Sequence, residues 1–190
     1  MAQMKLGNRG LSQVVTTLIL LVVSVLLAGI VTYYATNITM TRTEQENVDI
    51  SKSHVWVNST GGAEAGFVVQ CLGGRDVLID KITVRSVESG WSDVYIWRAG
   101  STAISDDLSY AQPAGADFDD DSFNVTIQGS ARYMVEPLND VDLASGQTIV
   151  FYVLNPDNIG LDDVGTTVSI TVFTVNGQYI EEVNVEYAGS

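Results

Sequence analysis

Three Asn-x-Ser/Thr triplets are the residues of this sequence whose types and spacing best fit a defined covalent reaction. They are Asn37-Ile38-Thr39, Asn58-Ser59-Thr60 and Asn124-Val125-Thr126, and none has Pro at the middle position. On a surface-exposed chain such a triplet is a candidate acceptor for an N-linked glycan. Triplets of this kind also arise by chance, so each one needs a structural test. Asn58 and Asn124 are the stronger candidates, because Asn37 adjoins an apolar segment.

The other reactive side chains lack the partners that catalysis or metal binding requires. His54 is the only histidine and has no nucleophile beside it in a triad arrangement, so we interpret it as a strand-edge residue. Cys71 is the only cysteine, which leaves no intrachain disulfide and indicates a buried thiol. The acidic cluster 117–121 lacks the Gly and final Glu of an EF-hand and predicts a solvated loop. We therefore expect no enzyme activity, no metal and no cofactor.

A long segment without charged residues determines where the rest of the chain is positioned. No charged residue occurs between Gly10 and Thr41, and 11–35 reads LSQVVTTLILLVVSVLLAGIVTYYA. About 20 apolar residues span a bilayer core, so this segment is long enough to cross a membrane. Its apolar residues occupy the whole helical circumference, and such a helix is buried either in lipid or in protein.

The short leader before the apolar segment predicts an unusual cleavage site. Residues 1–10 read MAQMKLGNRG and carry two basic and no acidic residues. A secretory signal has a shorter apolar stretch followed by a small-x-small site, and no such site follows here. Cleavage between Gly10 and Leu11 would instead remove the basic leader and leave the helix on the mature protein.

That arrangement resembles the class III signal of type IV pilins, and its residues resemble those of the archaeal branch. The matching residues are Arg9-Gly10 followed by LSQVVTTLIL at 11–20. The resemblance covers roughly the first 40 residues. It implies a prepilin that is held in the membrane, clipped after Gly10 by a prepilin peptidase, and polymerised with its helices in a filament core. An assembly ATPase and a membrane platform protein are implied as partners in the same way.

One departure from the bacterial pattern favours the archaeal branch. Bacterial members usually carry Glu as the fifth mature residue, whereas this chain has Val15 there. A charge pair between that acid and a neighbour's new N-terminus therefore cannot form, and archaeal relatives commonly lack the acid too. The Gly-rich start of archaellins is absent. An adhesive or general pilin consequently ranks above an archaellin.

The distribution of charge predicts topology. All 23 Asp and Glu lie from Glu44 onward, whereas the leader and helix flank carry Lys5, Arg9 and Arg42; the net charge is −14. Basic residues favour the cytoplasmic side of a membrane, so the N-terminus should lie inside and the acidic body outside. The acidity fits a soluble exposed surface. It disfavours binding to nucleic acid, because the body would repel phosphates.

The sequence predicts three regions: a leader at 1–10, an N-terminal helix at 11–50, and a head domain at 51–190. The helix is expected to continue to about Asp49, because 36–51 contains neither Pro nor Gly. Ala28 and Gly29 could let neighbouring helices approach closely. Equally, one Gly is simply tolerated in a membrane helix.

From His54 onward, short Val-, Ile-, Thr- and aromatic-rich runs alternate with Gly, Asn and Asp clusters, which predicts an all-β domain. The expected strands are 54–58, 66–72, 77–87, 94–98, 122–128, 132–135, 147–154, 167–175 and 178–187. Asn176-Gly177 predicts a two-residue type I′ hairpin, which would pair Ile170 with Val183. The predicted fold class is α+β, with a long hydrophobic helix followed by an immunoglobulin-like β-sandwich.

The functional prediction is a structural subunit of an extracellular archaeal type IV-like pilus, a helical homopolymer with an adhesive role. Its precursor would lie in the cytoplasmic membrane with the N-terminus inside. Three alternatives stay open: an archaellin, a monomeric surface protein anchored by one uncut helix, and a minor pilin whose head binds a sugar. The state of the native N-terminus and the presence of filaments distinguish these possibilities.

Overall fold

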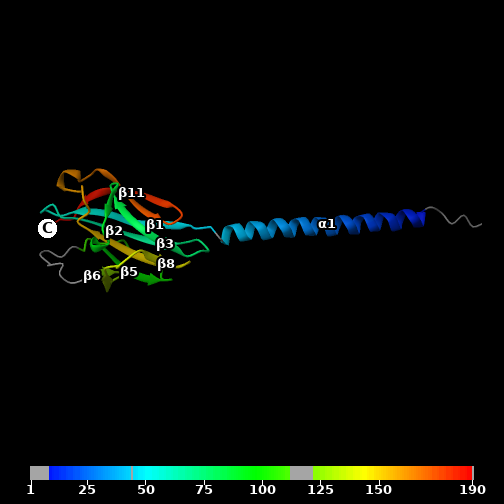
Figure 1. The fold of residues 1–190 in the computed structure, drawn as a ribbon, viewed down its shortest axis with the longest axis horizontal. Coiled ribbons are helices and arrows are strands. Elements are labelled where there is room, and N and C mark those ends of the chain that lie inside the picture. The colour runs from blue at the N-terminus through cyan, green and yellow to red at the C-terminus, as the bar shows by residue number, and fades with distance from the viewer. Residues whose placement is uncertain (1–8, 44, 112–121, 190) are drawn as a thin grey trace, which may run out of the picture. The chain divides into compact units, whose positions relative to one another are not determined.

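The computed structural model describes residues 9–43, 45–111 and 122–189 of the chain. The chain divides into two compact units between Thr43 and Glu44. The first contains a single helix, α1 (Arg9–Thr43), and the second contains all of the strands (Figure 1). The predicted architecture, a long apolar helix followed by an all-β sandwich, is therefore confirmed.

Helix α1 is uninterrupted for 35 residues because its sequence contains no Pro, and six of its Ser and Thr hydroxyls bond to carbonyls of the helix itself. The hydroxyls of Ser24 and Thr32 donate to the carbonyls of Leu20 and Ala28 at 2.7 and 2.8 Å. Four further Thr residues make the same kind of bond one turn back: Thr16, Thr17, Thr36 and Thr39. A Ser or Thr that bonds its own backbone presents little unmet polarity to an apolar environment.

The helix ends earlier than the sequence predicts. It stops at Thr43 rather than near Asp49, and Val48 already begins the first strand. Asn47 is held by the head, since its carbonyl accepts hydrogen bonds from the backbone N–H groups of Leu72 and Gly73 at 2.8 and 3.0 Å. These tertiary bonds outweigh a weak helical propensity in a Thr- and Asn-rich segment.

The described residues of the head form eleven strands and two short 3₁₀ turns. The strands are β1 (Val48–Val57), β2 (Ala63–Cys71), β3 (Val77–Val84), β4 (Val87–Ser89), β5 (Val94–Gly100), β6 (Ser122–Ile127), β7 (Ser130–Val135), β8 (Val141–Leu143), β9 (Thr148–Leu154), β10 (Thr167–Thr174) and β11 (Gln178–Tyr187). The 3₁₀ turns are η1 (Trp91–Asp93) and η2 (Leu161–Asp163).

Two sheets face each other in the sandwich. The hydrogen-bonded order is β4-β3-β10-β11-β1-β2-β9-β5-β7-β6, and β8 pairs with β3. Strands β3, β4, β8, β10 and β11 form one sheet, and β1, β2, β9, β5, β7 and β6 form the other. A short parallel ladder between β1 and β11, with Val55 opposite Val185, joins the two sheets along one edge. The chain's first and last strands are therefore neighbours.

The head has two apolar cores. The main core lies between the sheets, where Phe67 of β2 stacks on Phe151 of β9 with ring centroids 5.3 Å apart. The second core covers the outer face of β2 and β9 and includes Trp56, Tyr152 and Met134. Because both faces are covered, β9 is buried at all seven positions. This explains why its sequence, TIVFYVL, shows no polar alternation.

Two type I′ turns occur at positions where the sequence does not predict them. Arg85-Ser86 has φ values of +50° and +67° and separates β3 from β4, so the strand predicted at 77–87 is two strands. Gln128-Gly129, with φ values of +51° and +69°, joins β6 to β7. Positive φ at both central residues defines the turn type that suits a twisted hairpin.

The turn predicted at Asn176-Gly177 has a different register. Ile170 lies opposite Glu181 and Val168 opposite Val183, two residues from the expected pairing. The Thr174 hydroxyl accepts a hydrogen bond from the Gly177 N–H at 3.0 Å, which closes the turn around Val175 and Asn176 without positive φ. Because the slip is an even number of residues, every side chain stays on its predicted face.

Candidate functional site

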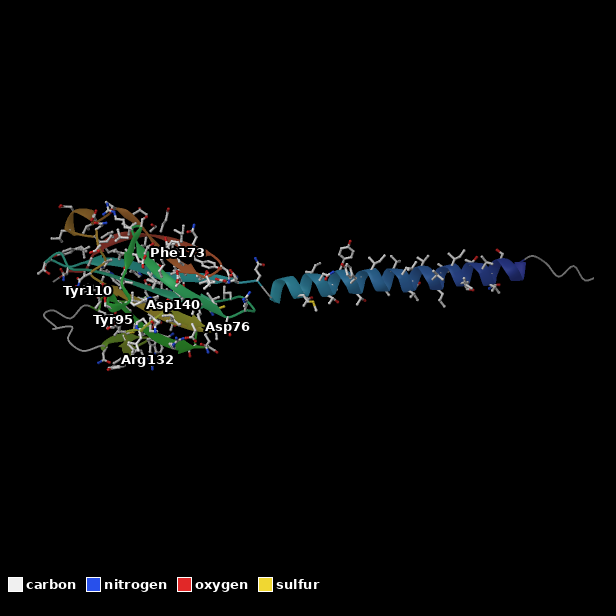
Figure 2. The ribbon with its side chains drawn as sticks, in the orientation of Figure 1. Asp76, Tyr95, Tyr110, Arg132, Asp140 and Phe173 are labelled. Atoms are coloured by element: carbon white, nitrogen blue, oxygen red, sulfur yellow. The ribbon has the colours of Figure 1, made fainter. Side chains whose placement is uncertain are left out.

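The apolar surface of α1 is the most unusual feature of the described residues. Ser12–Met40 forms one helix long and apolar enough to cross a membrane, with none of its most apolar window buried. Its large side chains, such as Leu21 at 65% exposed, project on all sides (Figure 2). At about 1.5 Å per residue, this span exceeds the roughly 30 Å of a bilayer core. The helix therefore needs lipid or protein around it.

The structure places the cleavage site and the small-residue pair that the sequence predicts in α1. The Gly10–Leu11 bond lies in the first turn of α1, whereas residues 1–8 of the leader fall outside the described residues. A Cβ added to Gly29 would meet nothing within 4 Å. Intrachain packing therefore does not explain the Gly29 and Ala28 pair, and a close helix–helix contact stays a prediction.

Asn58 belongs to a tightly bonded loop between β1 and β2. Its Oδ1 accepts hydrogen bonds from the Thr60 hydroxyl at 2.7 Å and from the backbone N–H groups of Thr60 and Gly62 at 3.0 and 2.8 Å. The Tyr110 hydroxyl also bonds to the Asn58 side chain. This asparagine therefore holds a turn together.

Asn124 has a different environment. It is exposed on β6, directly opposite Tyr133 of β7, and Thr126 is exposed on the same face. Asn37 lies within the apolar span of α1. The three triplets are alike in sequence but lie in a hydrogen-bonded loop, on a strand face and on a helix surface.

A buried polar network lies beneath the segment that leads from β5 toward β6. Glu64 is fully buried, and its Oε1 accepts a hydrogen bond from the Ala111 N–H at 2.8 Å. The Tyr152 hydroxyl donates to the carbonyl of Ser109 at 2.9 Å. Burial raises the pKa of the Tyr152 hydroxyl, and the nearby charge of Glu64 raises it further. These bonds fasten the 109–111 segment over the second core.

His54 sits at the edge of this network. A register shift separates Ser51 from His54 in the β1–β2 ladder, and the His54 ring stacks on the ring of Trp56, two residues on, with centroids 5.0 Å apart. His54 Nε2 lies 2.8 Å from Asp107, and this hydrogen bond is the main reason why the pKa of Asp107 is lowered. The two carboxylates near His54, Asp107 and Glu186, supply no nucleophile. The arrangement does not resemble a catalytic triad.

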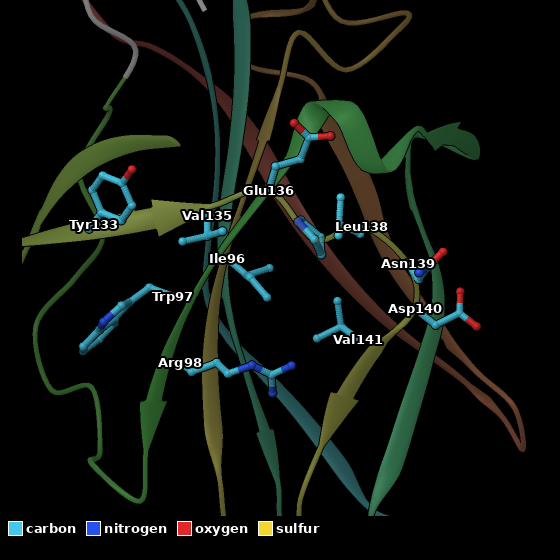
Figure 3. A pocket seen from close by; sticks show the side chains of 11 residues that line it. Ile96, Trp97, Arg98, Tyr133, Val135, Glu136, Leu138, Asn139, Asp140 and Val141 are labelled. Carbon is cyan, nitrogen blue, oxygen red and sulfur yellow. The ribbon is translucent and has the colours of Figure 1, made fainter. Parts of the chain in front are cut away.

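The head has an apolar groove at the open edge of the sandwich. Its volume is about 550 Å³, and it lies where β5 and β7 share one ladder pair, Ile96 with Val135, before they diverge (Figure 3). Residues 136–140 cross from β7 to β8 and form one wall, where Leu138 is 91% exposed. Arg98 lies on the floor of the groove and forms an ion pair with Asp142, with Arg98 Nη2 2.8 Å from Asp142 Oδ1.

The groove and the Glu64 network are features that the sequence does not predict. Both join residues far apart in the chain, and their only local signals are a Glu within an apolar strand and a Leu within a polar loop. Cys71 is buried, as predicted. In the described ranges no group of three or more His, Cys, Asp or Glu is placed to hold a metal ion. The acidic cluster 117–121 lies outside the described residues.

Comparisons with known proteins do not assign this chain to a family. No protein-family model matches it, and no curated protein sequence matches it. A solved family 123 glycoside hydrolase from Clostridium perfringens overlaps 77% of the chain at 9% identity with a TM-score of 0.32, and the chain spans 28% of that enzyme. A cohesin module from a Clostridium perfringens family 33 glycoside hydrolase overlaps 75% of the chain and 97% of the module, at 14% identity and a TM-score of 0.19. At these values the likeness carries no functional argument.

Proposed function

We propose that this protein is a structural subunit of an extracellular archaeal type IV-like pilus, which polymerises through α1 and exposes the acidic head to water. The observation that carries the proposal is the bare helix: Ser12–Met40 has no charged residue and is exposed throughout. The resemblance of Arg9-Gly10 and the following residues to a class III signal supports the same conclusion.

The physical steps follow from the solvent that α1 requires. In the precursor, lipid surrounds the helix, and the basic leader holds the N-terminus on the cytoplasmic side. Removing the leader after Gly10 eliminates charges that would be costly to bury in a filament core. The helix then exchanges lipid for neighbouring copies of itself with little change in apolar exposure. A prepilin peptidase, an assembly ATPase and a platform protein are the partners that this route needs.

The decisive experiment determines the native N-terminus and the assembly state from the same sample. Surface material from the producing cells is purified, imaged by electron microscopy, and analysed by mass spectrometry for its first peptide. We expect fibres whose subunits begin at Leu11. Single molecules in vesicles that retain residues 1–10 would instead identify a monomeric anchored protein.

A matched pair of variants tests the role of the helix. Leu21→Arg places a charge in the apolar span, which costs about 3 kcal/mol in membrane insertion and should abolish fibres. Leu21→Val keeps the span apolar and should preserve them. Swimming motility after gene deletion separates a pilin from an archaellin, because loss of motility would assign the filament to rotation.

A further inference from the structure

We propose that Asn124 is the N-glycosylated residue of the head, and that its glycan lies on the exposed apolar strip formed by Tyr133 and Val135. The inference goes beyond the filament function and rests only on the exported position of the head.

The β6–β7 hairpin fixes the position of the triplet. Val125 and Ile127 are each 2% exposed and anchor β6 in the second core. Side chains alternate along a strand, so Asn124 and Thr126 face outward together. Among the described strands, β6 ends the hydrogen-bonded order of the sheet and pairs only with β7. A glycosyltransferase can therefore reach both the amide and the hydroxyl.

The other two triplets are disfavoured by their surroundings. The bonds from Thr60 and Gly62 end on Asn58 Oδ1 and leave the amide nitrogen to a glycan. However, the Tyr110 hydroxyl bonds to the same side chain and Asn58 is half-buried, so the folded head leaves less room for a sugar there than at Asn124. Asn37 belongs to the span that lipid or neighbouring helices surround. Of the candidates, Asn124 alone combines exposure with a position on the water-facing domain.

The reaction requires a donor of a common chemical class, an oligosaccharide linked through a phosphate ester to a membrane lipid. The Asn124 amide nitrogen forms a bond to the anomeric carbon of the first sugar. The bond between that carbon and the phosphate oxygen breaks, and the lipid phosphate leaves with the electron pair. One amide proton passes to a base of the transferase.

Register brings the first sugar onto Tyr133. Asn124 and Tyr133 are directly opposite, a relationship that places Cβ atoms about 5 Å apart. Tyr133 is 60% exposed, and Val135, two residues further on the same face, is 47% exposed. The C–H face of a sugar ring can cover these apolar groups and remove them from water. Both residues also line the apolar groove (Figure 3), so the glycan would cover one side of its mouth.

Mass spectrometry of the native protein tests the site. Trypsin releases Asn124 in the peptide 99–132 and Asn58 in the peptide 53–75. We expect a glycan mass on Asn124, localised by electron-transfer fragmentation, and an unmodified Asn58. Thr126→Ala should abolish the modification, whereas Thr126→Ser should keep it. An unmodified Asn124, or a modified Asn58 beside an unmodified Asn124, would overturn the proposal.

Surface proteolysis of intact cells separates this result from a failure of the proposed function. If protease releases head fragments and Asn124 is unmodified, the glycan proposal fails while export stands. If the head resists protease until the cells are opened, export fails and the glycan proposal falls with it. The presence or absence of fibres in the same cells reports independently on the pilus.

A second measurement tests the contact with Tyr133. Glycosylated protein should unfold at a higher temperature than Thr126→Ala protein, and Tyr133→Ala should abolish most of that difference. Tyr133→Ala is suitable because its exposed side chain does not hold the core. A temperature difference that Tyr133→Ala leaves unchanged would show that the glycan lies elsewhere.

Discussion

Gly73 packs directly against Gln45, in the segment that leads into β1. A Cβ added to Gly73 would lie 2.6 Å from the carbonyl oxygen of Gln45 and 2.7 Å from the backbone nitrogen of Asn47. The Gly73 N–H donates to the Asn47 carbonyl at 3.0 Å. On the same segment, the Asn176 amide donates to Glu46 at 2.9 Å. The chain is thus held to the head before the first strand begins.

The first prediction is that Gly73→Ala destabilises the head. The new methyl group collides with backbone atoms, which cannot rotate away as a side chain can, so the cost should be about 1–3 kcal/mol. Denaturant unfolding of the full-length protein in detergent, followed by tryptophan fluorescence, measures it. Gly160→Ala is the control, because its added Cβ meets nothing within 4 Å. Equal stability of the two variants would contradict the close contact.

The second prediction concerns the bond that fastens the 109–111 segment. Tyr152→Phe removes the donor to the Ser109 carbonyl and should lower the free energy of unfolding by about 1 kcal/mol. It should also speed hydrogen exchange at the Ala111 N–H, which bonds to Glu64 beside it. Tyr187→Phe, on a tyrosine that is 54% exposed, should change neither quantity. Unchanged exchange at Ala111 in Tyr152→Phe would show that Glu64 alone holds the segment.

The sequence predicts the elements of this fold better than their connections. Each predicted strand overlaps an observed one, because β-branched and aromatic runs are local signals. The three-residue strands β4 and β8 were missed, since each forms only by pairing with β3. The Arg85-Ser86 turn contains neither Gly nor Asn and gives no local signal. Conversely, Asn176-Gly177 carries the expected signal, but Asn176 bonds to Glu46 and the Thr174 hydroxyl closes the turn.

The same distinction applies to the candidate sites. The apolar surface of α1 depends only on consecutive residues, so composition alone predicts it. The groove depends on where the chain crosses from β7 in one sheet to β8 in the other, which no local pattern encodes. Likewise, the apolar sequence around Asn37 distinguishes it from the other two triplets, whereas Asn58 and Asn124 differ only in the tertiary contacts around them.

The third prediction is a pH dependence of stability that comes from Asp163. The Gly160 N–H donates to Asp163 Oδ2 at 2.9 Å and Arg85 lies 2.7 Å from its Oδ1, and these contacts lower the pKa of Asp163. A carboxyl whose pKa is lower in the folded state stabilises the fold above its unfolded pKa, near 4, and this contribution is lost as pH falls further. Asp163→Asn should therefore be less stable than wild type at pH 7, with the difference shrinking below about pH 4.

Urea unfolding at a series of pH values measures this dependence. Asp162→Asn, on the exposed neighbouring residue, is the matched control and should follow the wild-type curve. A gap between Asp163→Asn and wild type that stays constant from pH 7 to pH 3 would show that the contribution of Asp163 is not ionic.

The fourth prediction compares the effect on stability of a change in the groove wall, at Leu138, with that of a change beneath the groove, at Ile96. Leu138 is 91% exposed, so Leu138→Ser should change the free energy of unfolding by less than about 0.5 kcal/mol. Ile96 is 9% exposed and belongs to the main core, so Ile96→Ala should cost about 2–5 kcal/mol. In protein made without glycan, Leu138→Ser should also weaken binding of a fluorescent apolar dye, because it removes apolar surface from the groove wall. Strong destabilisation by Leu138→Ser would mean that the 136–140 crossing packs onto the core and leaves no open groove.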